Sequence, residues 1–554
     1  MTPPAILEEL TESAPAKSRP KIGFVSLGCP KNLVDSEVMM GMLHQAGGQL
    51  TPEAEDAEIL VVNTCSFIDS AKQESVNTIL EMAQHKQANG GRAQRLIVAG
   101  CLVERYRDEI QKNIPEVDAV VGTGELENIL AAAGLSPTGQ PADSPFPILT
   151  QAQIDRLPSA VRQHSRPDMS TEAGAPGTRS LPGNATTKDR VPHPSQTHRD
   201  GWESKTPSRP EGDLREQQGR FSRAAWDGAA AILPEYLYSD TTPRILTTPR
   251  ASAYIKIAEG CDHPCGFCII PQLRGKFRSR RMSSIVAEAE NLIAQGIREI
   301  TLIGQDTTCY GEDLGIKDGL AQLLEALAAL PNLRWLRFLY AYPNKVTTRL
   351  LETIARHDNI AKYLDVPLQH ASPSVLKRMK RGGTPEVFLK LIEKARGIVP
   401  GIVLRTSFIV GFPGETEEDY KQLEAFITAA QIDWLGVFTY SDEEGAAAFN
   451  LSPELKLPKR TIESRRRKLM KLQQKISARA KSKWVGREID LLVEGPSEET
   501  DLLWEGRTPL HAPEIDGKVF INDFGAHETL VPGSFYRAEI TESHDYDVVA
   551  RILD

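Results

Sequence analysis

Short apolar runs alternate with helical patterns along the first part of the chain. Three of them are KIGFVSLG (21–28), AEILVVNT (57–64) and AQRLIVAG (93–100). Continuous apolar runs that are rich in β-branched residues are typical of strands buried on both faces. We therefore predict a parallel sheet built from βα units over residues 20–136.

The same alternation returns over residues 234–450, where six apolar runs are separated by helical stretches. The runs are AYIKIAEG (253–260), EITLIGQ (299–305), WLRFLYA (335–341), YLDVPLQ (363–369), VLRTSFIVG (403–411) and WLGVFTYS (434–441). Six regular βα units favour a (β/α)6 partial TIM-type barrel. A basic helical stretch, residues 456–483, follows. We interpret it first as a connector and second as a nucleic-acid contact, and we end the central domain at residue 482.

Residues 483–554 change to short alternating strands bounded by turn residues. The five runs are REIDLLVEG (487–495), TDLLWEGRT (500–508), KVFIND (518–523), SFYRAEITES (534–543) and YDVVARIL (546–553). Five such strands predict a small β-barrel of the OB type. The predicted fold is therefore α/β, with a parallel-sheet domain, a partial barrel and a small C-terminal β-barrel.

Residues 137–233 have a different composition. Twelve prolines lie between Pro137 and Pro210, and Ser, Thr, Gly and Gln fill the spaces between them. Such a segment buries too little apolar surface to offset the entropy of ordering. We predict a disordered linker, and a separate small domain is the alternative.

Composition narrows the class of protein. The 554 residues are 40% hydrophobic and 25% charged, which is ordinary for a globular chain. The sequence lacks an apolar run long enough to span a membrane and an N-terminal secretory signal, so we expect a cytoplasmic protein. The seven cysteines are an odd number in a compartment that keeps thiols reduced. They are expected to bind metal or to react.

Three cysteines lie together in the loop after the first central strand. Cys261, Cys265 and Cys268 have the spacing C-x3-C-x2-C, and no fourth cysteine follows them nearby. Chemistry in parallel βα folds gathers at the carboxyl ends of strands. Three thiolates on a [4Fe–4S] cluster leave one iron open for a further ligand. A zinc loop with a remote fourth ligand is the alternative.

A second set of three cysteines follows the three N-terminal strands. Cys29, Cys65 and Cys101 are each 36 residues apart, and each is preceded by a small residue. The carboxyl ends of neighbouring parallel strands meet at one edge of a sheet, so these thiols are expected to converge on a second open cluster. Three separate buried thiols are the alternative. The seventh, Cys309, is interpreted as an ordinary thiol.

These motifs resemble the methylthiotransferase family of radical S-adenosylmethionine (SAM) enzymes. The segments SLGCPKNLVDSE, NTCSFIDSAKQES, YIKIAEGCDHPCGFCIIPQLRGKFRSR and PLQHASPSVLKRMKRGGT are similar to the branch that modifies ribosomal protein uS12. The resemblance covers nearly all of the chain except residues 137–233. It implies that the C-terminal barrel is a TRAM domain.

The resemblance also implies cofactors and contacts. Each cysteine triad would hold a [4Fe–4S] cluster. The central cluster would cleave SAM to a radical that abstracts hydrogen from an aspartate β-carbon of uS12, and the N-terminal cluster would hold the methylthio group. Candidate SAM or substrate contacts are Phe267, Gln305, Asp306, Gln369, Gly411 and Gly414, each of which is also compatible with an ordinary loop or core role. No catalytic residue beyond the cluster ligands is predicted.

The charge distribution separates a protein substrate from an RNA substrate. From Gly486 to Asp554 there are 5 basic and 16 acidic residues, a net charge of −11, whereas the whole chain carries −9. RNA-binding modules are basic, so this barrel favours a basic protein such as uS12.

Alternatives are an acidic surface that only aids solubility, a transfer-RNA methylthiotransferase and a non-enzymatic iron–sulfur protein. We expect a monomer that also needs an electron donor and a sulfur source.

Overall fold

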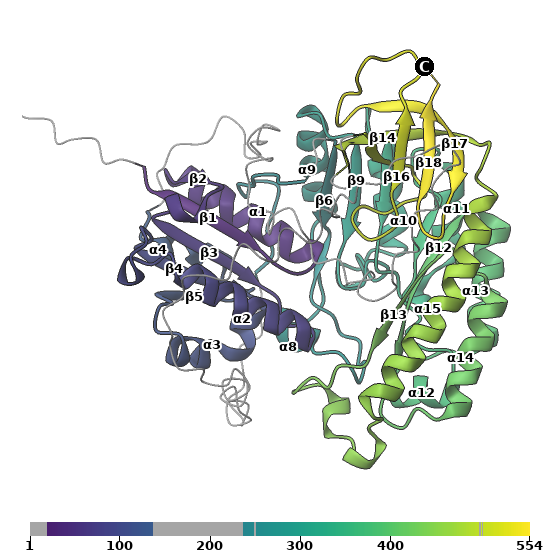
Figure 1. The fold of residues 1–554 in the computed structure, drawn as a ribbon, viewed down its shortest axis with the longest axis horizontal. Helices are drawn as coiled ribbons and strands as arrows, with labels where there is room; N and C mark the ends of the chain where they lie inside the picture. The colour runs from purple at the N-terminus through teal and green to yellow at the C-terminus, as the bar shows by residue number, and fades with distance from the viewer. Residues whose placement is uncertain (1–18, 137–235, 249–250, 498–499, 501, 554) are drawn as a thin grey trace, which may run out of the picture. The chain divides into compact units, whose positions relative to one another are not determined.

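The computed structural model describes residues 19–136, 236–248, 251–497, 500 and 502–553 (Figure 1). The predicted linker, residues 137–233, lies outside the described residues.

Five parallel strands form the N-terminal sheet in the order β2-β1-β3-β4-β5. The strands are β1 (Lys21–Ser26), β2 (Gln49–Thr51), β3 (Ile59–Thr64), β4 (Arg95–Gly100) and β5 (Ala119–Val121). The accompanying helices are α1 (Pro30–Gln45), α2 (Asp69–Ala83), α3 (Cys101–Asn113) and α4 (Ile129–Ala133). The three predicted strands are the three central ones. The edge strands β2 and β5 were not predicted because three residues are too few to show a periodicity.

The central region contains six strands in two three-stranded parallel sheets, β10-β9-β6 and β11-β12-β13. The strands are β6 (Ser252–Lys256), β9 (Glu299–Ile303), β10 (Trp335–Phe338), β11 (Tyr363–Asp365), β12 (Val403–Val410) and β13 (Trp434–Thr439). A single parallel bridge between Leu336 and Ile360 joins the two sheets. All six predicted strands are present, which confirms the partial barrel.

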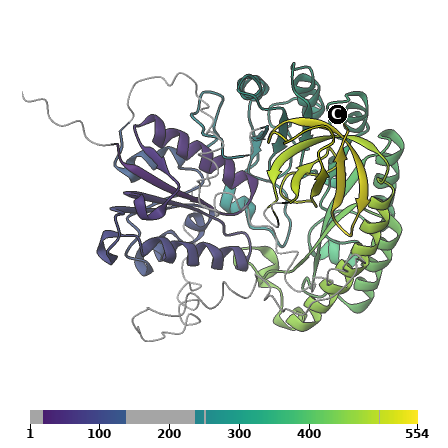
Figure 2. The same ribbon diagram turned by 45° about the horizontal axis from the view of Figure 1, so that its top comes forward.

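Helices cover the outside of this partial barrel (Figures 1 and 2). They are α9 (Met282–Ala294), α10 (Gly319–Ala328), α11 (Thr348–Arg356), α13 (Pro385–Ile398) and α14 (Glu417–Ala430). Two short helices lie in loops: α8 (Ile270–Arg274), which packs against α3, and α12 (Pro373–Arg378), which follows β11. Helix α14 shows why such a segment is helical. Thr416 and Asp419 form a reciprocal capping box at its start, and Tyr420, Leu423 and Ile427 then bury one face.

The last helix and the C-terminal barrel complete the chain. Helix α15 (Lys459–Ser482) leads into a closed barrel of order β14-β15-β16-β18-β17. Its strands are β14 (Glu488–Pro496), β15 (Trp504–Arg507), β16 (Val519–Asp523), β17 (Phe535–Ser543) and β18 (Val548–Ile552). Ala538 and Ile540 are fully buried while Glu539 between them is not, which is the period of two that the sequence predicts.

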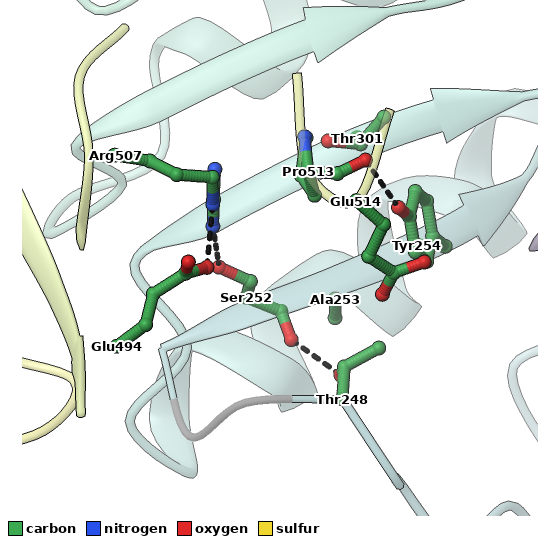
Figure 3. A pocket seen from close by; sticks show the side chains of 9 residues that line it. All are labelled: Thr248, Ser252, Ala253, Tyr254, Thr301, Glu494, Arg507, Pro513 and Glu514. Atoms are coloured by element: carbon green, nitrogen blue, oxygen red, sulfur yellow. Dashed lines mark hydrogen bonds and ion pairs between the residues drawn. The ribbon is translucent and has the colours of Figure 1, made fainter. Parts of the chain in front are cut away.

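A buried ion pair and a small cavity mark where the barrel meets the central sheet. Arg507 of β15 donates to Glu299 of β9 at 2.7 Å. Burial raises the pKa of Glu299, but the charges of Arg507 and Arg337 outweigh burial and leave this pKa lowered to about 2. Figure 3 shows Arg507 beside Ser252 in a cavity of about 20 Å³. That volume fits about one water molecule, so this cavity is too small for a cofactor.

Candidate metal centres

The three N-terminal cysteines lie at one edge of the parallel sheet. Cys29 follows β1 and caps α1, Cys65 follows β3, and Cys101 is the first residue of α3 after β4. Strands β1, β3 and β4 are neighbours in the sheet and run in the same direction. Their carboxyl ends therefore bring the three thiols to the same place, as the sequence predicts.

Burial and mutual proximity both affect the pKa values of these thiols. Burial raises the pKa of the Cys65 thiol, and the neighbouring thiols Cys101 and Cys29 raise it further. The pKa of Cys101 is raised to about 11, mainly by burial, with Arg274 lowering it and Cys29 raising it. Three crowded thiols of this kind ionise only when a cation compensates their charge.

The small residues before the cysteines permit the close approach. Gly28 has a φ of 95°, and a Cβ atom there would lie 2.8 Å from the Cβ atom of Cys65. Gly100 has a φ of 92°, and a Cβ atom there would lie 2.2 Å from the side-chain oxygen of Asn63. A larger residue at either position would push the strand ends apart.

Asn32 ties two of the cysteine loops together. Its side-chain amide donates to the carbonyl oxygens of Leu27 and Thr64, each at 2.9 Å, and the amide of Asn63 donates back to the carbonyl of Asn32. Asn32 was not identified from the sequence as a functional residue, although it lies in the segment SLGCPKNLVDSE. A polar amide in the first turn after Cys29 is the signal that could have identified it.

The central cysteines lie in a loop that is anchored by backbone hydrogen bonds. The loop follows β7 (Ala258–Glu259), which pairs with β8 (Arg278–Ser279). The amide of Cys261 donates to Gly275, that of Gly266 to Met379 and that of Cys268 to Cys265. Burial is the main cause that raises the pKa of Cys261 to about 11 and of Cys268 to about 12, and neighbouring thiols contribute to both.

The sulfur atoms of each cysteine triad are spaced more widely than ligands on a single ion. Among the described residues, the one group of three His, Cys, Asp or Glu ligand atoms within 4.8 Å of one another is His263, Asp306 and Cys309. In neither cysteine triad do all three sulfur atoms lie within 4.8 Å of one another. Thiolates on one tetrahedral zinc ion lie about 3.8 Å apart, given Zn–S bonds of about 2.3 Å. A [4Fe–4S] cluster places each thiolate on a different iron, so the wider spacing fits a cluster.

The side chains of Arg381, Tyr342 and His263 stack on one another beside the central triad. The guanidinium of Arg381 donates to the sulfur of Cys265 at 3.3 Å and lies 4.5 Å from the ring centre of Tyr342. His263 stacks on Tyr342 with ring centres 3.9 Å apart, and its Nε2 lies 2.6 Å from a carboxylate oxygen of Asp306. Sequence reasoning missed Tyr342 and Arg381, although Arg381 lies in the quoted stretch RMKRGGT.

The predicted contact residues lie at or near strand ends, in different environments. Gln305 donates to Glu259 at 2.6 Å, and its side-chain oxygen is buried with no donor among the described residues. Phe267 is half-buried and packs against the apolar cluster of Val375 and Phe412. Gln369 has a φ of 74° and exchanges backbone hydrogen bonds with β12.

The two predicted glycines are explained partly by packing. A Cβ atom at Gly411 would lie 2.6 Å from the side chain of Ile462 on α15. A Cβ atom at Gly414 would lie 3.2 Å from the guanidinium of Arg378. Both residues have φ near 80°, which favours glycine.

Arg274 connects the two cysteine regions. It ends α8, six residues after Cys268, and donates to Asp35 at 2.6 Å and to Glu259 at 3.2 Å. It also donates to the side-chain oxygen of Asn32. Burial opposes its charge, but Cys101, Glu259, Asp35 and Cys29 together leave the pKa of Arg274 raised well above its ordinary value. The segment that follows the central cysteines therefore places a cation beside the N-terminal thiols.

Comparison with known families divides the chain into three matches. Residues 21–122 match the Uncharacterized protein family UPF0004, residues 255–427 match the Radical SAM superfamily, and residues 485–553 match the TRAM domain. The described helices include none that is long and apolar enough to cross a membrane.

Similar proteins cover nearly the whole chain. It is 63% identical over 543 residues to the ribosomal protein uS12 methylthiotransferase RimO of Koribacter versatilis, with 98% of each chain covered. The protein of the same name from Solibacter usitatus is 50% identical and covers 96% of this chain and 95% of its own. The solved structure of the radical SAM methyltransferase TsrM from Kitasatospora setae matches 76% of this chain and 72% of its own at 14% identity, with a TM-score of 0.43.

Proposed function

Because this chain belongs to the ribosomal protein uS12 methylthiotransferase RimO family, we propose that it attaches a methylthio group to the β-carbon of an aspartate of uS12. The family is supported by 63% identity over 98% of the chain. The observation that carries the chemistry is the pair of three-thiol sites, which come from different segments and are linked by Arg274, a residue that follows the central triad in sequence and lies beside Cys101 and Cys29.

The proposal assigns one [4Fe–4S] cluster to Cys29, Cys65 and Cys101 and a second to Cys261, Cys265 and Cys268. The open iron sites would supply the reductive cleavage of SAM and a place for the sulfur, chemistry that no ordinary side chain provides. The chain's own residues hold the six thiolates and bury them. Arg274 and Arg381 place a positive charge beside each set of sulfurs, which favours the ionised ligands.

The strand ends next to the central triad would bind SAM. The buried oxygen of Gln305 needs a donor, and an ammonium group of a ligand would supply one. Asp306, held by His263, adds a carboxylate at the same strand end. The remaining proposed contacts are Phe267, Gln369, Gly411 and Gly414.

The substrate is proposed to be a basic protein. Some of these acidic residues pair with cations outside the barrel segment, Asp490 with Arg334 at 2.9 Å and Asp516 with Arg405 at 3.6 Å, so the barrel surface is less negative than the count of −11 implies. Asp523 and Glu528 are exposed and form no ion pair with a described residue. They are suited to attract lysine and arginine of uS12.

The rest of the proposal concerns organisation. We propose a cytoplasmic monomer that takes electrons from an external donor and sulfur from an external source. Its domains are residues 20–136, 234–482 and 483–554, with residues 137–233 as the linker.

The test is a reconstituted reaction. Purified protein with both sites loaded is incubated without oxygen with SAM, a chemical reductant, sulfide and uS12. Methylthiolated uS12 and 5′-deoxyadenosine are the expected products. If SAM is cleaved and transfer RNA rather than uS12 gains the methylthio group, the chain has the chemistry but a different substrate, and the proposal is wrong.

A further inference from the structure

Helix α15 concentrates positive charge. Its 24 residues, Lys459–Ser482, contain ten lysines and arginines and one acidic residue, Glu463. Ile462, Leu469 and Ile476 are buried at intervals of seven residues and pack into the central core. The opposite face of the helix therefore points outward, and α15 is seen on the outside of the molecule in Figure 1.

Three of the ten cations have partners. Arg465 is buried and pairs with Glu415 at 2.5 Å and with Glu417 at 3.0 Å. Arg466 pairs with Glu463, and Lys481 is buried with its Nζ atom 3.4 Å from the ring centre of Trp434. These three cations are explained by the fold.

The other seven cations are exposed, and none forms an ion pair with a described residue. They are Lys459, Arg460, Arg467, Lys468, Lys471, Lys475 and Arg479. At 100° per residue, all of these except Lys459 lie within an arc of about 120°, and the rise of about 1.5 Å per residue spreads them over about 28 Å. We call these six residues, Arg460 to Arg479, the α15 stripe.

The stripe is costly for an isolated helix. Arg467, Lys471, Lys475 and Arg479 follow one another at i, i+4 spacing, where like charges repel. Alternating acidic and basic residues are typical of a solvent-exposed helix face, and the stripe has no acidic residue of its own. The charged residues that line the shallow groove between α14 and α15 are Lys421 and Glu424, which offset each other. A polyanion would remove the repulsion.

The stripe and the acidic barrel are adjacent but differ in sign. Helix α15 carries a net charge of +9, and its carboxyl end packs against β17 of the barrel, whose segment carries −11. A basic protein fits the barrel, whereas phosphates fit the stripe. Both occur together on a ribonucleoprotein particle, where a basic protein is embedded in RNA.

We propose that the α15 stripe binds the phosphate backbone of ribosomal RNA beside uS12, so that the substrate is uS12 within the assembled small subunit. This inference rests on the proposed function. Phosphate contacts of this kind are insensitive to sequence and set the position of the protein on the particle.

The test replaces four cations of the stripe. The variant Arg467→Gln/Lys471→Gln/Lys475→Gln/Arg479→Gln keeps helix-forming residues and removes four charges. The control, Lys112→Gln/Lys317→Gln/Lys390→Gln/Lys394→Gln, removes four exposed charges elsewhere. Affinities for small subunits, protein-free small-subunit RNA and free uS12 are measured over a salt series.

The stripe variant is expected to bind subunits and RNA at least about tenfold more weakly, and its salt slope is expected to fall by about 0.7–0.9 per lost contact. The control variant and the binding of free uS12 should change little. Equal subunit affinity for the stripe and control variants would overturn the proposal. A parallel loss of free uS12 binding would also overturn it, because the helix would then contact protein.

Failure of the proposed function has a different signature. In that case the wild type modifies uS12 in neither form, whatever the stripe binds. The same comparison of stripe and control variants on RNA then decides whether the stripe is a phosphate site.

Discussion

Arg274, six residues after Cys268, donates a 2.6 Å hydrogen bond to Asp35, six residues after Cys29. Both groups are buried, and each belongs to the first helix after a cysteine. The pair therefore links the helix that follows Cys29 to the helix that follows Cys268.

Replacing Arg274 should destabilise the protein. Arg274→Gln removes a positive charge from beside the buried carboxylates of Asp35 and Glu259. Breaking a buried ion pair in this way costs about 3–5 kcal/mol of unfolding free energy. The exposed pair of Arg356 with Glu325 is the control, and Arg356→Gln should cost about 0–1 kcal/mol. Urea unfolding of both variants measures the difference. Equal stability of the two would mean that Arg274 is not a structural link.

The two cysteine triads should contribute equally to the iron content. Full loading of two clusters gives about eight irons per chain. Replacing Cys261, Cys265 and Cys268 by Ala should remove about half of the iron and abolish 5′-deoxyadenosine. Replacing Cys29, Cys65 and Cys101 should also remove about half but leave SAM cleavage.

Iron analysis and chromatography of the product measure both effects, and Cys309→Ser is the cysteine control that should keep its iron. If the variant without the central triad still makes 5′-deoxyadenosine, that loop does not hold the SAM-cleaving cluster.

Arg381 should influence the central cluster through the Cys265 sulfur. Loss of a hydrogen bond to a charged group costs about 1.5–3 kcal/mol, which corresponds to about ten- to a hundredfold in rate if it is fully expressed in the transition state. Arg381→Gln should slow SAM cleavage accordingly, with unchanged iron content and a more negative cluster potential, and Arg381→Lys should recover part of the loss. Redox titration monitored by electron paramagnetic resonance measures the potential; an unchanged potential would rule out this role.

Lys481 should make stability depend on pH. Burial lowers the pKa of Lys481 to about 8 in the folded protein, against about 10.5 when unfolded. Between these values the unfolded state binds more protons, so the free energy of unfolding should rise with pH from about 8 to 10.5, by about 3 kcal/mol in all. Below pH 8 this gain is absent.

The variant Lys481→Met isolates this effect from other titrating groups. The difference in unfolding free energy between the variant and wild type should favour the variant at pH 7 and shrink by about 3 kcal/mol towards pH 10.5. A difference that is constant with pH would show that Lys481 is charged in the folded protein throughout.

Charge reversal on the barrel should weaken uS12 binding. The sequence directs attention to Glu498, Glu499, Asp501 and Glu505, but the first three lie outside the described residues, and Glu505 already pairs with Lys518. We therefore choose Asp523→Lys/Glu528→Lys, with Glu386→Lys/Glu393→Lys on α13 as the control. The barrel variant should bind uS12 more weakly and with less salt dependence, as measured by titration calorimetry. Equal affinities of the two variants would refute the role of the barrel charge.

The sequence predicts the strands that precede the N-terminal cysteines, because buried runs such as 21–26 and 59–64 have a strong apolar signal. It also predicts the convergence of Cys29, Cys65 and Cys101. It could not predict the partners of Arg274, since Asp35 and Arg274 are 239 residues apart and each is an ordinary charged residue in a helix. Contacts such as that of Arg381 with Cys265 depend on tertiary packing, which a local pattern does not contain.

The central claim is that both three-cysteine sites are needed to modify uS12. The most direct measurement uses cells from which this protein has been deleted. The intact mass of uS12 is measured in these cells alone and after the wild type or one of the triple-alanine variants is supplied. The account predicts the mass of one added methylthio group with the wild type and its absence with either variant. A methylthiolated uS12 in cells without the protein, or with either triad removed, would contradict it.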